Sequence, residues 1–114
     1  MEHIYGLSFM ILNASKNQVN DRRDPVQMTV KDLRLATLYN LNSASAAMAL
    51  VENLEELNIF FEGSTGRKAL PFWYVLNGPL ADAIYHTGQM VSFRRTSGNP
   101  MNPKVNVFMG KTDL

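Results

Sequence analysis

The chain has 114 residues, of which 46% are apolar and 18% charged, a composition typical of a globular domain rather than of a disordered segment. Its formal net charge is +1 and its basic residues are scattered, which gives no electrostatic basis for binding nucleic acid or a membrane surface. Cysteine is absent, which excludes disulfides and thiolate chemistry. We therefore expect one cytoplasmic domain over residues 1–114, without a membrane span.

The first predicted element is a helix over residues 2–19. Its apolar residues recur at intervals of three and four, which is the period of a helix with one buried face. His3 lies one turn before Leu7 and shares its face. A polar connection over 20–25 follows, where Pro25 disfavours helical geometry at the preceding residue. The apolar positions are Ile4, Leu7, Met10, Ile11 and Ala14.

The second predicted helix is the longest, over residues 29–61. Thr29 is placed to cap its N-terminus, with Asp32 three residues later. A seam with steps of three and four runs along the whole segment, although a break within 40–45 is an alternative. Thr37 and Asn40 are polar members of this seam. We expect them to be hydrogen-bonded core residues rather than ligand contacts.

The third predicted helix covers residues 71–96, after a loop at 62–68. Gly78-Pro79 should kink it, and Gly98 can supply its C-terminal stop. Residues 99–114 are predicted to form an extended C-terminal tail. The sequence thus predicts an all-α fold with three recognisable helices joined by polar loops. Because four amphipathic helices close a core better than three, we expect a further N-terminal helix to be missing.

The third helix carries the most informative pair of residues. Asp82 and His86 are four positions apart, which puts a carboxylate and an imidazole side by side on one helical face. Together with His3 they would offer two imidazoles and one carboxylate, a donor set that suits Zn²⁺, Ni²⁺, Fe²⁺ or Mn²⁺. Otherwise His86 is a hydrogen-bonded core histidine and His3 is simply exposed. Candidates for orienting the ligands are Gln89, Tyr85, Asn77 and Asn40.

The run from Gly78 to Pro100 resembles the last helix of the DinB-like (DinB/YfiT) superfamily, whose members are bacterial four-helix bundles with a divalent metal. Its pattern there is a His-x-x-x-His pair, then Gly-Gln, then an arginine before a Gly-Pro-like exit. His86-Thr87-Gly88-Gln89 matches the second half of the pair and the Gly-Gln element. Arg94 or Arg95 with Gly98 matches the exit. Asp82 stands where the family usually has the first histidine of the pair.

The resemblance implies a DinB-like up-down bundle that lacks the family's first helix, and a homodimer. It also implies a divalent metal ion held by His3, Asp82 and His86, since His3 falls where the family has its second-helix histidine. The family includes metal-dependent hydrolases and thiol transferases acting on small molecules, so it implies a metal site more strongly than any one reaction. No residue stands out as a general base, and the catalytic residues stay unassigned.

Two functions are consistent with these patterns. The first is a metal-dependent hydrolase or thiol transferase acting on a small molecule. The second is a non-catalytic helical interaction module that self-associates through its small-residue seam, with Asp82 and His86 as a structural ion pair.

Overall fold

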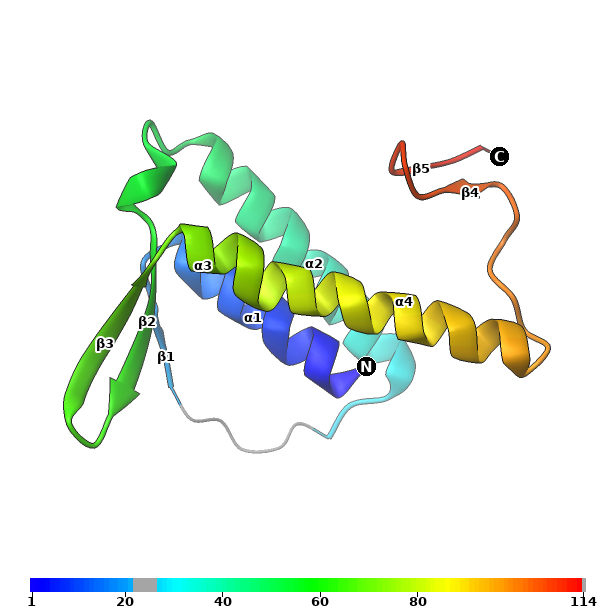
Figure 1. Ribbon diagram of the computed structural model, residues 1–114, viewed down its shortest axis with the longest axis horizontal. Coiled ribbons are helices and arrows are strands. Elements are labelled where there is room, and N and C mark those ends of the chain that lie inside the picture. Colours follow the sequence, from blue (N-terminus) through cyan, green and yellow to red (C-terminus); the bar gives the residue numbers. More distant parts are fainter. Residues whose placement is uncertain (22–26, 114) are drawn as a thin grey trace. The chain divides into compact units, whose positions relative to one another are not determined.

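The structure is a computed structural model that describes residues 1–21 and 27–113 (Figure 1). Most of the polar connection predicted at 20–25 lies outside the described residues. The chain divides into two compact units, Met1–Ile84 and Tyr85–Leu114. The long helices are α1 (Glu2–Ser15), α2 (Val30–Ala49) and α4 (Ala81–Thr96), and α4 runs without a break through the boundary between the units.

Helices α1 and α2 pack against each other in the first unit (Figure 1). Thr29 caps α2 as predicted, because its Oγ1 accepts a hydrogen bond from the backbone N–H of Asp32 at 3.1 Å. On each helix, buried apolar or seam residues recur at intervals of three and four, which gives each helix one face toward the other. The buried residues include Ile4, Leu7, Ile11 and Ala14 on α1, and Leu33, Thr37, Asn40 and Ala44 on α2.

The polar residues of the α2 seam are bonded within the core, as predicted. Asn40 Nδ2 donates to Ser8 Oγ on α1 at 3.1 Å, and Ser8 Oγ donates to the carbonyl oxygen of Tyr5 at 2.7 Å. Thr37 Oγ1 donates to the carbonyl oxygen of Leu33 at 2.7 Å. Each buried hydroxyl or amide therefore has a partner, which avoids the cost of an unsatisfied polar group.

The second predicted helix ends much earlier than the sequence suggested. Helix α2 stops at Ala49, and the chain continues through a short 3₁₀ turn, Leu54–Glu56, into strand β2 (Asn58–Gly63). The seam predicted over 50–61 is therefore wrong. Ile59, Phe60 and Phe61 are residues that favour strands, and Ile59 is 1% exposed on the inner face of β2. Burial in a sheet outweighs the helical spacing of the neighbouring apolar residues.

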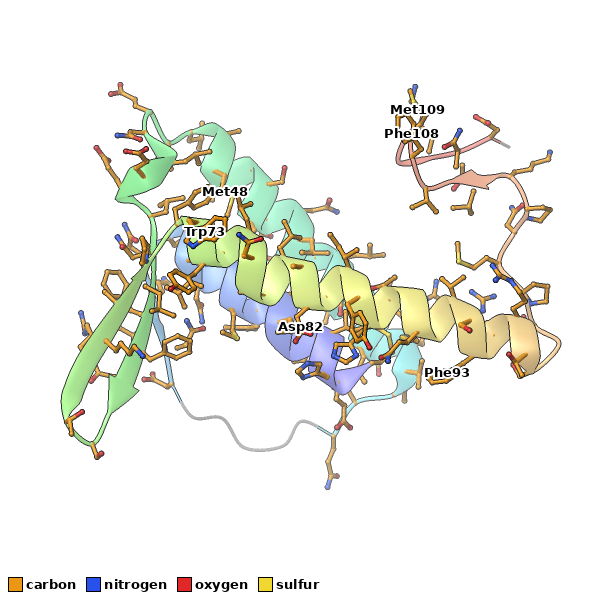
Figure 2. The ribbon with its side chains drawn as sticks, in the orientation of Figure 1. Met48, Trp73, Asp82, Phe93, Phe108 and Met109 are labelled. Carbon is orange, nitrogen blue, oxygen red and sulfur yellow. The ribbon has the colours of Figure 1, made fainter. Side chains whose placement is uncertain are left out.

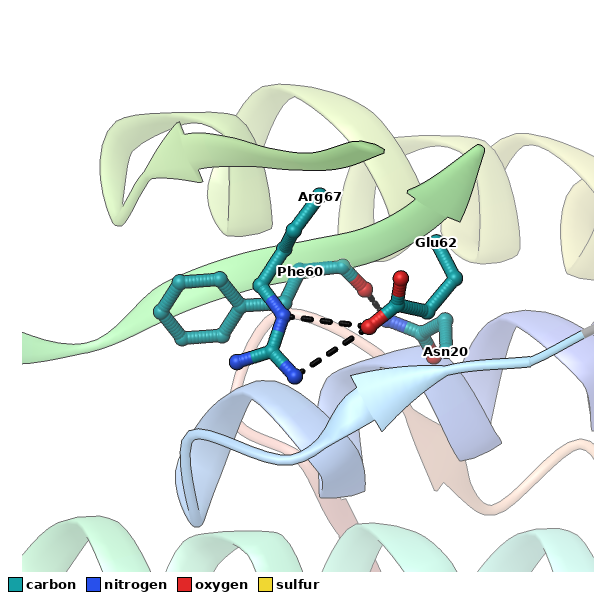
Figure 3. Close-up of polar contacts among 4 residues, drawn as sticks. All are labelled: Asn20, Phe60, Glu62 and Arg67. Carbon is teal, nitrogen blue, oxygen red and sulfur yellow. Dashed lines mark hydrogen bonds and ion pairs between the residues drawn. The ribbon is translucent and has the colours of Figure 1, made fainter. Parts of the chain in front are cut away.

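Strand β2 forms a hairpin with β3 (Gly66–Pro71), where a loop was predicted. Gly66 adopts a φ of 112°, which favours glycine and allows the tight turn. The short strand β1 (Val19–Asn20) pairs with the other edge of β2 in parallel, giving the order β1-β2-β3. Arg67 lies 5.8 Å above the Phe60 ring, and its guanidinium donates to Glu62 Oε1 at 3.1 and 3.2 Å (Figure 3).

Two asparagines attach the sheet to α1. Asn20 Nδ2 donates to the carbonyl oxygen of Phe60 at 3.1 Å, and Asn13 Nδ2 on α1 donates to Asn20 Oδ1 at 2.9 Å (Figure 3 shows the first bond). The core then joins α1, α2, β2 and the turn α3 (Trp73–Val75). Its most buried residues are Ile11, Ala14, Ala44, Ile59 and Val75.

The third predicted helix is present but interrupted where Gly78-Pro79 predicted a kink. The turn α3 leads into a π-helical segment, Leu76–Leu80, and Gly78 has non-helical dihedral angles of −110° and −105°. Pro79 cannot donate a backbone hydrogen bond, so the regular ladder is broken there. Helix α4 begins directly after it, at Ala81.

In the second unit, α4 ends at Thr96 and Gly98 follows with a φ of 79°. The backbone N–H of Asn99 bonds to the carbonyl oxygen of Arg94 at 2.8 Å, which closes the last turn, and Arg94 Nε donates to the carbonyl oxygen of Asn99. The predicted stop at Gly98 is therefore confirmed. Beyond it lies a small antiparallel pair, β4 (Val105–Asn106) and β5 (Lys111–Thr112).

The all-α prediction, with its DinB-like four-helix up-down bundle, is therefore wrong. The described chain combines three long helices with two small sheets, which is an α+β arrangement. Sequence periodicity predicted three helices, but it extended the first to Val19, which lies in β1, and the second to Phe61, which lies in β2. It also missed the hairpin that completes the core between α2 and α3.

Within the described residues, no helix combines the length and the apolar character required to cross a bilayer.

Candidate metal centre

His3 is held on the first turn of α1. Its side chain is 61% exposed, but the next residue, Ile4, and the residue one turn later, Leu7, are both buried. These two anchors fix the N-terminal turn of the helix against the core. The imidazole therefore projects from a well-packed turn rather than from a loose chain end.

Asp82 and His86 lie on the first two turns of α4, as the sequence predicted. Ala83, which lies between them in the sequence, is buried and marks the face of α4 that packs on the core. Both side chains are partly exposed, so neither carboxylate nor imidazole is sealed from water. Figure 2 shows Asp82 on the side of α4 next to α1.

The three predicted ligands come together. His3 Nε2 lies 3.0 Å from Asp82 Oδ2. Within the part of the chain that the structure describes, these residues and His86 form the one group of His, Asp and Glu side chains close enough to hold a metal ion. One ligand atom from each lies within 4.8 Å of the others. The ligand atoms of one tetrahedral Zn²⁺ stand about 3.4 Å apart, so the atoms of this group that are furthest apart would have to approach each other by about 1 Å to share an ion.

Gln89 orients His86, as predicted. His86 Nδ1 lies 2.7 Å from Gln89 Oε1, and Gln89 Nε2 donates to Tyr85 Oη at 3.4 Å. Because an amide oxygen only accepts, this contact places a proton on Nδ1, and in the neutral ring the lone pair then lies on Nε2. This is the arrangement in which a metal-binding histidine is held by a partner on its other ring nitrogen.

The other two predicted orienting residues lie elsewhere. Asn40 bonds to Ser8 within the α1–α2 core, and Asn77 is exposed in the π-helical segment before α4. Asp82 bonds to His3, and His86 bonds to Gln89; the alternative in which Asp82 and His86 form a structural pair stays untested. The side chain of Asp82 is 44% exposed, so the carboxylate lies at the surface and not in the core.

A groove of about 480 Å³ opens beside His3, between α1 and the strands β1 and β2. Its lining is mainly apolar, and Tyr5 and Phe9 stack edge to face in it with ring centroids 6.3 Å apart. Sequence analysis did not indicate this groove, because the strand that forms its far wall was predicted to be part of a helix. The lining residues are Glu2, His3, Tyr5, Gly6, Leu7, Phe9, Met10, Asn20, Asp21, Phe61 and Glu62.

The chain matches no protein-family model, and comparisons with curated proteins and with solved structures found no match. The resemblance to the DinB-like superfamily therefore stays a prediction that depends on the residues from Gly78 to Pro100.

Proposed function

We propose that this protein binds one divalent transition-metal ion through His3, Asp82 and His86. The observation that supports the proposal is the convergence of two imidazoles and a carboxylate from distant parts of the chain, with one ligand atom of each within 4.8 Å of the others. A mixed nitrogen and oxygen donor set of this kind suits Zn²⁺, Ni²⁺, Fe²⁺ or Mn²⁺.

The orientation of His86 supports the same proposal. Gln89 holds Nδ1, so the lone pair on Nε2 has a defined direction, and Tyr85 in turn holds the Gln89 amide. Such outer partners reduce the entropy that a flexible histidine loses on binding a metal. The Gly88-Gln89 element is also the part of the DinB-like pattern that this sequence matches best.

The activity we propose is hydrolysis or thiol transfer on a small molecule. When bound, such an ion would supply Lewis acidity and keep coordination positions for a reactant. The groove beside His3 can accommodate an apolar group of that molecule against Tyr5 and Phe9. His3 is both one of the proposed ligands and one of the residues that line this groove, so the groove lies beside the proposed metal site.

Titration calorimetry with Zn²⁺ and with Mn²⁺ tests the proposal. The wild-type chain should bind one ion per chain, whereas Asp82→Asn and His86→Ala should each lose binding. The matched control is Asp113→Asn, which removes an exposed carboxylate outside the site and should bind as the wild type does. Equal binding by wild type, Asp82→Asn and His86→Ala would contradict the proposed site.

A further inference from the structure

The outer face of α2 carries an apolar stripe that the fold does not bury. At about 100° per residue, six residues of α2 fall within an arc of about 100°. This arc lies opposite the face that packs on α1 through Leu33, Thr37, Asn40 and Ala44. The outer stripe consists of Leu35, Leu38, Tyr39, Asn42, Ala46 and Ala49, all of which are exposed.

The large residues of the outer stripe are unusually open to solvent. Leu35 is 57% exposed, Leu38 55% and Tyr39 70%. Single exposed apolar residues are common on protein surfaces, but a continuous stripe of them along a helix is typical of an interface. The helix that carries it has 20 residues, so it offers a contact up to about 30 Å long.

We propose that a second copy of this chain covers the outer stripe, with the two α2 helices antiparallel about a two-fold axis at Asn42. Size complementarity identifies this partner. Leu35 and Ala49 lie at equal separations in sequence on the two sides of Asn42, and so do Leu38 and Ala46. In an antiparallel pair each leucine therefore meets an alanine of the second copy, and helices approach closely where large residues face small ones.

The charges at the two ends of α2 favour the same arrangement. Lys31 and Arg34 are exposed on its first turns and outweigh the exposed Asp32 between them, while Glu52, Glu55 and Glu56 are exposed just after its C-terminal end, with no basic residue among them. Antiparallel helices bring the basic end of one copy beside the acidic segment of the other, and their dipoles are opposed as well. A parallel pair would instead place like charges together. The self-complementary charge pattern therefore selects both the partner and the direction.

Disulfide trapping tests this register, because the native chain has no cysteine. Asn42→Cys lies on the proposed axis and should form a disulfide-linked dimer under mild oxidation. Leu35→Cys alone should not, whereas Leu35→Cys mixed with Ala49→Cys should give a cross-linked heterodimer. Efficient self-linking of Leu35→Cys would overturn the antiparallel register.

A size swap followed by sedimentation over a concentration series tests the contact without cross-linking. Leu38→Ala and Ala46→Leu should each weaken dimerisation by about tenfold, and the double variant should restore it because a large residue again faces a small one. The control is Phe108→Ala, which removes another exposed large residue, 96% exposed, and should leave dimerisation unchanged. A wild-type chain that stays monomeric at every concentration, or an equal loss in the control, would overturn the proposal.

Discussion

The imidazole Nε2 of His3 lies 3.0 Å from Oδ2 of Asp82, although the two residues are 79 positions apart in the chain. The contact joins the first turn of α1 to the first turn of α4. It exists because the core residues Ile4 and Leu7 fix one turn and Ala83 fixes the other. A pair held in this way needs little rearrangement to share a metal ion, which is why the proposed function depends on it.

Gln89 provides a test of how His86 is oriented. Gln89→Ala should lower the affinity for Zn²⁺ by about 10- to 100-fold, the usual cost of losing an outer partner of a metal-binding histidine. Gln89→Glu keeps an acceptor oxygen for Nδ1 and should retain most of the affinity. Gln18→Ala, which removes an exposed amide far along the chain, is the control. Identical affinity for Gln89→Ala and wild type would show that His86 does not depend on this bond.

The Asn40–Ser8 bond should contribute measurably to stability. Asn40→Ala removes the donor to Ser8 Oγ inside the α1–α2 core and should lower the free energy of unfolding by about 1–3 kcal/mol, as measured by urea denaturation. Asn77→Ala removes an exposed asparagine and should change it by less than about 0.5 kcal/mol. The interpretation of Asn40 as a core residue fails if the two variants are equally stable.

The strand at 58–63 can be distinguished from the helix that the sequence suggested. Ile59→Ala should cost about 2–5 kcal/mol because Ile59 is almost completely buried on β2. Leu54→Ala, at a position of the predicted helical seam that is 39% exposed, should cost less than about 1 kcal/mol. The reverse order of these two costs would favour a continuous helix.

Two glycines should respond to alanine with opposite signs. Gly66→Ala places a side chain at a φ of 112° and should destabilise the hairpin by about 1–2 kcal/mol. Gly6→Ala lies within α1, where an added Cβ meets nothing within 4 Å, and should stabilise the protein by up to about 1 kcal/mol. Thermal unfolding of both variants measures the difference, and destabilisation by Gly6→Ala would contradict the structure of α1.

The sequence was sufficient for those features that depend on local geometry. Thr29 begins a helix because its hydroxyl reaches the N–H of Asp32, and Gly98 ends one because it can adopt a positive φ. The side-by-side placement of Asp82 and His86 likewise follows from helical spacing alone. Each of these depends on residues within one or two turns of one another.

The sequence was insufficient where long-range packing decides the structure. Leu54 and Phe61 continue the helical spacing of α2, yet Ile59 is buried in a strand that pairs with β1 and β3. A periodic pattern is a weak guide when a short apolar run has two ways to become buried. The groove beside His3 was missed for the same reason, since β2 forms one of its walls. The convergence of His3 with Asp82 was expected only from the family resemblance.

Measuring the metal content of the purified protein is the most direct test of the proposed site at His3, Asp82 and His86. The protein should be purified without chelator, incubated with Zn²⁺ or Mn²⁺, desalted and examined by elemental analysis beside His86→Ala. The proposed site predicts about one divalent ion per wild-type chain and a clear loss in the variant. A wild-type chain that retains neither metal, or a variant that retains as much as the wild type, would contradict it.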